Sequence, residues 1–229
     1  MPLTLITPTG GRPEAFALCE RWMGRQTYRG DVQWIVVDDC EEATVVTMGQ
    51  TVIRPQPWWK LGAPTTQYAN VRAALELVKH DKIVHIEDDD WYGPTYLETT
   101  YHRLDAAPLV GECPARYYNA RFRRWMNCGN RAHASLFQTA MRAEVIPTLR
   151  QICLAREWID LSLWERVPEA RQALFFGEET VGMKGLPGRP GHIWAHRRQA
   201  LVRMAADPQL EKLREWIGDD AAEYGRFHE

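Results

Sequence analysis

Residues 82–86, with the sequence KIVHI, are followed at once by the acidic run EDDD at residues 87–90. A short apolar, β-branched run is typical of a strand that is buried on both faces, as in a parallel sheet. Four successive carboxylates at the end of such a strand repel one another. A bound divalent cation relieves this repulsion, because hard cations prefer carboxylate and phosphate oxygens as ligands. The run therefore predicts a metal site; the alternative is a solvated acidic turn before a helix that follows Pro94.

Two other apolar runs also end in small or acidic residues. Residues 3–6 (LTLI) precede TPTGG at residues 7–11, and residues 34–37 (WIVV) precede Asp38 and Asp39. Helical patterns lie between the runs, at residues 12–23 and 67–79. Alternating strands and helices predict right-handed βαβ units, whose ligands bind beyond the carboxyl ends of the strands. We expect the three polar clusters to share that edge of the sheet.

The predicted fold class is α/β: a Rossmann-type, mostly parallel sheet flanked by helices, in a single domain with a C-terminal helical extension. A chain of 229 residues is long enough for one such core. Residues 140–167 are expected to be largely helical, and residues 174–176 could form a late strand. Residues 206–229 would form the C-terminal helix, with Asp207 as its N-cap and Pro208 at its first position.

Composition excludes several other classes of protein. The formal net charge of -2 gives no global attraction to nucleic acid or to an anionic membrane. The five cysteines form no CxxC pair, which argues against a disulfide framework and a structural zinc site. The apolar runs are far shorter than the roughly 20 residues of a membrane span, and no cationic-then-apolar leader precedes Leu3. We expect a soluble, cytoplasmic protein with no membrane partner.

The first two polar clusters have features that suit a nucleotide. A carboxylate at the position of Asp38 or Asp39 can accept hydrogen bonds from a ribose hydroxyl or a base N–H; the alternative is that it caps a helix or a turn. The segment at residues 7–12 can present backbone N–H groups and the Arg12 guanidinium to phosphates. It lacks a Walker lysine and a complete GxGxxG pattern, so neither phosphate-binding motif applies.

The ordered motifs LTLITPTGGRPEAF, WIVVDDC and KIVHIEDDDWYGPTYLE resemble the A-type glycosyltransferase (GT-A) fold, especially its family 2, over about residues 3–105. The resemblance implies a hexosyltransferase-like enzyme that moves a sugar from a nucleoside diphosphate sugar to a hydroxyl acceptor. The expected donor is a UDP-sugar, and the expected cofactor is Mn²⁺ or Mg²⁺. Residues 1–110 would then be the nucleotide-sugar-binding half. Residues 111–205 would be the acceptor-binding and catalytic half of the same domain.

The resemblance also implies roles for individual positions. Asp89 would be the principal metal ligand, aided by Glu87, which replaces the first aspartate of the family's DxD motif with a longer acid. Asp39 would contact the base or ribose, and Asn70 resembles the Asn of a helix start that helps to place the sugar diphosphate. The full set of expected donor-binding positions in this half is Thr7, Pro8, Thr9, Arg12, Asp38, Asp39, Asn70 and Asp88.

Inverting members of the family use a carboxylate base, often in an acidic motif that reads D-L-x-L. The nearest match is REWIDLSLWERV, which makes Asp160 the candidate catalytic base and Glu157 the second choice. A base must lie within hydrogen-bond reach of the acceptor hydroxyl. The alternative is a surface carboxylate on an amphipathic helix, and Glu178 with Glu179 is a rival pair. The sequence does not decide between inversion and retention.

Late basic residues follow a Gly/Pro-rich loop at residues 182–191. Several enzymes of this fold use a histidine late in the chain as a further metal or diphosphate ligand. Here His196 is the first candidate and His192 the second. A lone histidine is also often structural. Lys184 and Arg197 could stabilise the departing diphosphate by their charge.

Residues 115–131 mix arginines with aromatic residues. That combination suits a sugar, a phosphorylated acceptor or an extruded base, and it motivates a hydroxymethylated DNA base as a speculative acceptor. The alternative is a hairpin whose aromatic side chains turn inward. Two other functions stay open: a nucleotidyltransferase with an acidic metal site, and a non-catalytic nucleic-acid-binding module.

Overall fold

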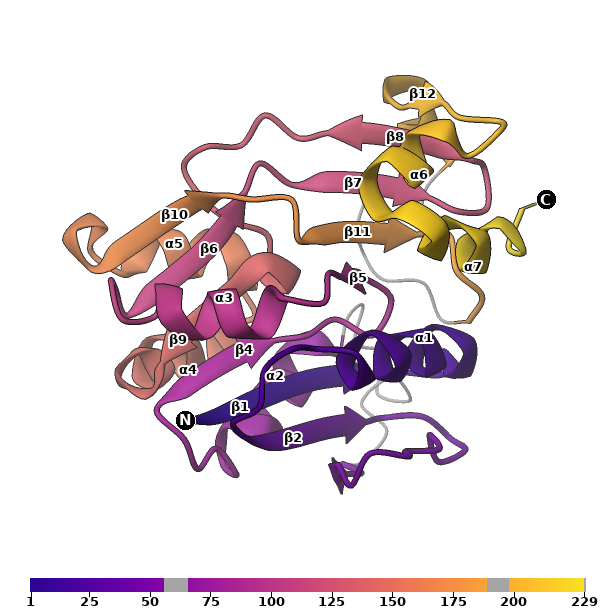
Figure 1. The fold of residues 1–229 in the computed structure, drawn as a ribbon. Coiled ribbons are helices and arrows are strands. Elements are labelled where there is room, and N and C mark those ends of the chain that lie inside the picture. The colour runs from indigo at the N-terminus through magenta and orange to yellow at the C-terminus, as the bar shows by residue number, and fades with distance from the viewer. Residues whose placement is uncertain (56–65, 189–197, 229) are drawn as a thin grey trace.

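The computed structural model describes residues 1–55, 66–188 and 198–228. Within these ranges, seven strands form a sheet in the order β10-β6-β9-β4-β1-β2-β3 (Figure 1). Its strands are β1 (Pro2–Thr9), β2 (Asp31–Asp38), β3 (Thr51–Ile53), β4 (Lys82–His85), β6 (Leu109–Cys113), β9 (Thr139–Arg142) and β10 (Gln172–Phe176). The three apolar runs read from the sequence are β1, β2 and β4, and they lie next to one another in the middle of the sheet.

Most neighbouring strands of this sheet are parallel. β1 pairs in parallel with both β2 and β4, β2 with β3, and β10 with β6. The exception is β9, which lies between β4 and β6 and is antiparallel to both. The predicted mostly parallel α/β sheet is confirmed. The expectation of a largely helical segment from residue 140 is wrong at its start, because residues 139–142 complete this sheet.

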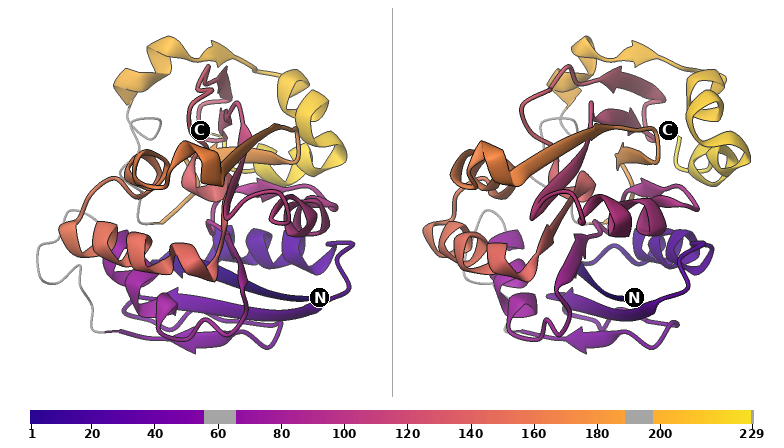
Figure 2. Two further views of the ribbon diagram at one scale, coloured as in Figure 1. Left: turned by 90° about the vertical axis from the view of Figure 1, so that its left-hand side faces the viewer. Right: turned by 60° about the vertical axis from the view of Figure 1, so that its left-hand side comes forward.

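Helices cover both faces of the seven-stranded sheet (Figure 2). They are α1 (Pro13–Gly24), α2 (Gln67–Leu75), α3 (Tyr96–Arg103), α4 (Ile146–Ala155) and α5 (Ile159–Arg166). Alternate residues of one strand serve different cores, since successive side chains of a strand point to opposite faces. Leu5 packs with α1 and α3 in one apolar core, whereas Ile6 packs with α2, α4 and α5 in the other. This two-sided burial explains why the central strands are continuously apolar.

A second sheet in the described part of the chain has the order β12-β8-β7-β11-β5. Its strands are β5 (Trp91–Tyr92), β7 (Arg116–Asn119), β8 (Arg124–Asn127), β11 (Thr180–Lys184) and β12 (Ala205–Ala206). Gly182, expected in a loop, lies inside β11, where a Cβ atom would stand 2.5 Å from the Tyr117 ring. The described residues also include short 3-10 helices: η2 (Leu136–Gln138), η3 (Ala143–Val145), η4 (Glu169–Arg171), η6 (Arg198–Arg203) and η7 (Gly218–Asp220).

The C-terminal segment lies against the second sheet as two helices, α6 (Glu211–Ile217) and α7 (Ala221–Gly225) (Figure 1). The expectation of one continuous helix is therefore wrong. Gly218 adopts a φ of 60°, which suits glycine and ends α6. Asp207 does cap the first turn, because its carboxylate oxygens accept from the amides of Lys212 and Leu213, both at 3.1 Å, but the helix begins later than predicted, at Glu211.

None of the helices in the described ranges has both the length and the apolar character that a membrane crossing requires.

Candidate functional site

The polar clusters that follow β1, β2 and β4 meet at one edge of the sheet. The parallel register pairs Thr9 with Asp38 and Ile6 with His85, so the three carboxyl ends lie side by side. Thr9 Oγ1 donates a 2.7 Å hydrogen bond to Asp88 Oδ2, and the Asp39 amide donates to the Thr9 carbonyl at 3.3 Å. The common edge expected from the sequence is confirmed. It is the position where open α/β sheets bind their ligands.

The acidic run folds into a tight group after β4. Ligand oxygens of Glu87, Asp89 and Asp90 lie within 4.8 Å of one another, which is close enough for one cation to touch all three. Asp88 points elsewhere, toward Thr9 and Arg12. Asp90 is almost fully buried, and among the described residues its Oδ2 atom has no hydrogen-bond partner. The sequence predicts Glu87 and Asp89 as metal ligands, and the structure places a carboxylate oxygen of Asp90 beside theirs.

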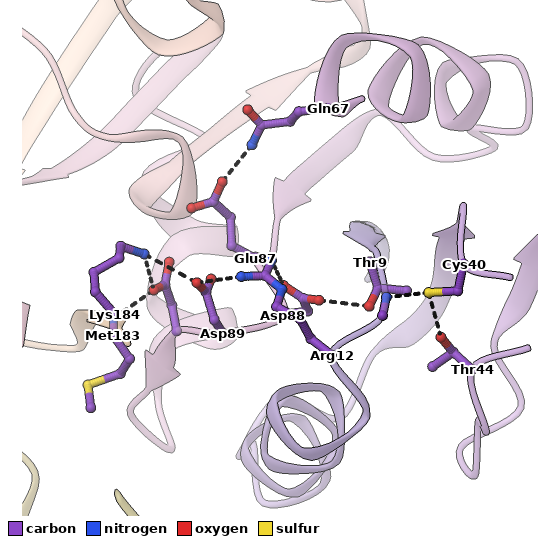
Figure 3. A network of polar contacts seen from close by, with 12 residues as sticks. Thr9, Arg12, Cys40, Thr44, Gln67, Glu87, Asp88, Asp89, Met183 and Lys184 are labelled. Atoms are coloured by element: carbon purple, nitrogen blue, oxygen red, sulfur yellow. Dashed lines mark hydrogen bonds and ion pairs between the residues drawn. The ribbon is translucent and has the colours of Figure 1, made fainter. Parts of the chain in front are cut away.

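Two basic side chains enclose this group (Figure 3). Arg12, from the loop after β1, contacts Asp88 through Nη2 and Asp89 Oδ2 through Nη1 at 2.8 Å. Lys184, from β11, lies 3.0 Å from Asp90 Oδ1 and 3.5 Å from Asp89 Oδ2 through its Nζ atom. The backbone amide of Met183 also donates to Asp90 Oδ1, at 2.7 Å. The second sheet thus supplies one wall of the acidic group.

Burial and crowding of like charge perturb these carboxyls. Removal from water raises the pKa of Asp88 to about 6 against the opposing effect of Arg12, and the Asp89 charge raises it further. Burial likewise raises the pKa of Glu87 and Asp90, while Lys184 opposes both shifts. Among the described residues, four carboxylates face two cations, which leaves a formal excess of two negative charges. Oxygen ligands with this excess charge fit a hard divalent cation.

Other positions expected to bind the donor have different surroundings. Thr7 is buried, and its Oγ1 atom accepts a 2.9 Å hydrogen bond from Trp34 Nε1, inside the core. Asp38 accepts from the amides of Cys40 and Thr44, at 3.0 and 2.8 Å. These two hydrogen bonds, together with those from the side chains of the same two residues, outweigh the effect of burial and lower the pKa of Asp38. Asp38 therefore organises the loop after β2.

Three further positions lie near the edge. Pro8 pairs with Val37 in the register of β1 and β2, and Asp39 is almost fully buried beside it. Asn70 lies on the sheet-facing side of α2, 2% exposed, and its Oδ1 atom has no hydrogen-bond partner within the described ranges. An unpaired buried carbonyl oxygen is rare in folded proteins and marks a place where a donor group from a ligand or water fits.

Gln67 is a further residue of the site that the sequence did not predict. Gln67, the first residue of α2, donates a 2.7 Å hydrogen bond from Nε2 to Glu87 Oε1, which connects α2 to the acidic group. Its place at the amino end of a helix that follows a strand is the one feature that could have indicated it.

The two candidate bases differ in their partners. Glu157 forms an ion pair with Arg166, so its charge is already compensated. Asp160, in the first turn of α5, has no ion pair with any described residue, and burial raises its pKa, opposed in part by a hydrogen bond from the Leu161 amide. Burial, the Cys153 thiol and the Asp160 carboxylate all raise the pKa of Tyr68. Asp160 stands on α5, which packs in the same apolar core as α2, the helix that begins with Gln67.

The rival acids Glu178 and Glu179 belong to the turn before β11. Glu179 accepts a hydrogen bond from Thr95 Oγ1, and its backbone amide donates to the buried Glu112 Oε1 at 3.1 Å. The Glu178 carbonyl accepts from Arg116. These contacts hold the turn against α3 and β7.

The arginine and aromatic residues at 116–127 form the hairpin of β7 and β8. Arg116 donates to the Thr180 carbonyl at 3.1 Å, Arg123 to that of Pro208 at 2.7 Å and Arg124 to that of Met204 at 2.9 Å. The Trp125 ring packs edge-on against Trp216 of α6, with centroids 5.6 Å apart. Three of these arginines therefore bind the protein's own backbone, as in the inward-facing hairpin considered above. The candidates His192, His196 and Arg197 lie outside the described residues.

Comparison with known proteins gives a result for structure alone. No protein-family model matches the chain, and no curated protein matches it. Among solved structures, S. aureus TarS 1-349 in complex with UDP superposes with a TM-score of 0.56 at 11% identity, over 80% of this chain and 60% of that one. The mannosyltransferase PcManGT from Pyrobaculum calidifontis, in complex with GDP-Man and Mn²⁺, gives 0.54 at 12% identity, over 98% and 72%.

The chain spans 37% of another TarS structure, at 10% identity and a TM-score of 0.52, so it corresponds to part of that protein. Identities this low establish the fold only. The superpositions cover 80% and 98% of this chain, so the agreement extends over most of its fold. The chain has a GT-A-like fold.

Proposed function

We propose that this protein is a divalent-metal-dependent glycosyltransferase that moves a sugar from a nucleoside diphosphate sugar to a hydroxyl acceptor. One observation carries the proposal: the clustered oxygens of Glu87, Asp89 and Asp90 lie at the carboxyl edge of a GT-A-like sheet. Such carboxylates are tolerable at a buried strand end when a cation joins them to a diphosphate.

Glu87, Asp89 and Asp90 would hold the cation, Mn²⁺ or Mg²⁺. When bound, it supplies Lewis-acid stabilisation to the diphosphate leaving group. A Mn²⁺ complex of the structural neighbour PcManGT supports this choice.

The protein's own side chains complete the donor site. Arg12 and Lys184 place two fixed positive charges beside the position where negative charge develops on the leaving diphosphate, which is the arrangement that stabilises such a transition state. Asp39 and Asn70 are suited to a ribose or sugar hydroxyl. We favour a UDP-sugar because TarS neighbours contain UDP and UDP-GlcNAc, and the GDP-Man of PcManGT makes a GDP-sugar the comparison to test.

On the acceptor side, Asp160 would take the proton of the attacking hydroxyl in an inverting reaction. Its lack of an ion pair among the described residues and its raised pKa suit a general base better than the paired Glu157 does. A hydroxymethylated DNA base has no support here, because three of the five arginines that motivated it bind backbone carbonyls of the protein.

A thermal-shift screen of sugar nucleotides with and without Mn²⁺, followed by a hydrolysis assay of each donor that binds, tests the function. A ligand specific to the native state raises its apparent stability by mass action, so we expect one donor class to stabilise the protein only with Mn²⁺. If no sugar nucleotide shifts the melting temperature or is hydrolysed, the proposal fails. Pyrophosphate release from a nucleoside triphosphate would instead identify a nucleotidyltransferase, and label transfer to hydroxymethylated DNA would restore that acceptor.

A further inference from the structure

Lys184 occupies an unusual position for a lysine. Its side chain is 2% exposed, and its Nζ atom lies between Asp89 Oδ2 at 3.5 Å and Asp90 Oδ1 at 3.0 Å. Buried lysines are rare unless paired, and this one is paired with two acids that also belong to the predicted cation site. The same ammonium group that stabilises the acids therefore competes with any metal for them.

Asp89 is the centre of this competition. Its Oδ2 atom lies 2.8 Å from Arg12 Nη1 as well as 3.5 Å from Lys184 Nζ (Figure 3). A dication bound to Asp89 and Asp90 would stand within a few ångströms of Lys184. Repulsion between like charges at that range is large in a buried site, because little water screens it.

A diphosphate changes the balance. Its oxygens can accept from Lys184, which frees the carboxylates for the cation, and its negative charge compensates the added positive charge. Lys184 can turn from the carboxylates to the diphosphate without a movement of the backbone, because a lysine side chain has several rotatable bonds and its ammonium group has three N–H donors.

We propose that Lys184 is a resident counter-ion of the acidic site that makes divalent-cation binding depend on the donor's diphosphate. This inference rests on the proposed function for its ligands, but it concerns binding alone. By thermodynamic linkage, the cation must then favour diphosphate binding by the same factor as the diphosphate favours the cation.

Mn²⁺ affinity, measured from the electron paramagnetic resonance of free Mn²⁺, tests the proposal with pyrophosphate as a probe that needs no choice of base. A protein-free blank corrects for chelation. In the wild type we expect pyrophosphate to tighten Mn²⁺ binding about tenfold or more. In Lys184→Met we expect Mn²⁺ alone to bind about tenfold tighter than in the wild type, and the gain from pyrophosphate to fall to about threefold or less.

Two further variants serve as controls. Lys184→Arg keeps the charge and should keep the wild-type coupling. Lys82→Met removes another buried lysine, which pairs with Asp105 at 2.6 Å and is absent from the acidic group, and it should leave Mn²⁺ affinity unchanged. Lys184→Gln replaces the Met variant if the latter does not unfold cooperatively.

A wild type whose Mn²⁺ affinity is the same with and without pyrophosphate overturns the proposal, whatever the variants do. A folded Lys184→Met or Lys184→Gln protein that binds Mn²⁺ no tighter than the wild type also overturns it. Failure of every sugar nucleotide to turn over would count against the proposed function, and the Mn²⁺ measurements would still decide the role of Lys184.

Discussion

Trp22 Nε1, on α1, donates a 2.8 Å hydrogen bond to Tyr224 Oη, on α7, across 202 residues of sequence. Both side chains are buried, and the centroids of their rings are 6.1 Å apart. The C-terminal segment is thus tied to the helix that follows β1, and it takes part in the core on that face of the sheet.

Replacement of Tyr224 by Phe should destabilise the protein by about 1–3 kcal/mol, because it leaves the buried Trp22 N–H without an acceptor. Urea unfolding followed by fluorescence measures the change. Tyr101→Phe is the matched control: among the described residues no hydrogen bond to its hydroxyl is present, so we expect a change of about 0.5 kcal/mol or less. Equal effects of the two substitutions would contradict the role of the Trp22 contact.

Arg12→Met should be strongly destabilising in metal-free buffer, by about 3 kcal/mol, because it leaves Asp88 and Asp89 buried with one cation fewer. Arg21→Met removes an arginine that pairs with Glu223 at 2.7 Å on the surface, where such pairs contribute about 1 kcal/mol or less. Chemical denaturation of both variants gives the comparison. We also expect Mn²⁺ to recover part of the loss in Arg12→Met, and a variant as stable as the wild type without metal would refute the stabilising role of Arg12.

Asp89→Asn should reduce donor turnover by about a hundredfold or more, because it removes charge from the oxygen that faces both cations and the predicted metal. The assay is metal-dependent release of nucleoside diphosphate from a sugar nucleotide. Asp105→Asn, which alters an acid paired with Lys82 outside the acidic group, should leave turnover nearly unchanged. Wild-type turnover in folded Asp89→Asn would remove the basis of the proposed mechanism.

Asp160→Asn should lower transfer to an acceptor by about a hundredfold while donor affinity is retained, since a general base contributes about that factor. Glu157→Gln should have little effect because Arg166 already compensates that charge. Steady-state kinetics with the donor and the acceptor concentrations varied in turn separate the rate of transfer from the affinity for the donor. A larger loss in Glu157→Gln than in Asp160→Asn would reverse the assignment.

His85 makes folding stability depend on pH. Burial lowers the pKa of His85 from 6.5 to about 4, and its two ring nitrogens have no hydrogen-bond partner among the described residues. Below pH 6.5 the unfolded chain binds a proton on His85 that the folded protein does not, so the contribution of His85 to stability falls as the pH drops from 6.5 to 4, by about 3 kcal/mol in total. The raised pKa values of Glu87, Asp88 and Asp90 act in the opposite direction, so the His85 contribution is measured as the difference in unfolding free energy between the wild type and His85→Leu. Relative to His85→Leu, the wild type should lose about 3 kcal/mol between pH 6.5 and 4. A difference that does not change with pH would exclude this role of His85.

The central part of the fold and of the site could be predicted because local patterns determine it. β1, β2 and β4 are continuously apolar since helices cover both faces, and each ends in the polar residues that meet at the edge. Pro13 begins α1 as expected, and residues 174–176 belong to β10.

The remainder depends on contacts that no local pattern reveals. Strand β9 has four residues, too few to show a period, inside a stretch rich in helix formers. Lys184 reaches Asp90 across 94 residues, and Gln67 reaches Glu87 from a helix with a weak apolar stripe. In the sequence, Arg116, Arg123 and Arg124 suggest a nucleic-acid-binding surface. The structure shows that they instead donate to backbone carbonyls far from them in the chain.

Strand β5 begins at Trp91, directly after Asp90, and pairs with β11, which carries Lys184. The acidic run is therefore the short connection by which the chain leaves one sheet and enters the other. Any tilt of the smaller sheet against the larger one must move Asp90 relative to Glu87, so the spacing of the oxygens around a cation reports the angle between the two sheets.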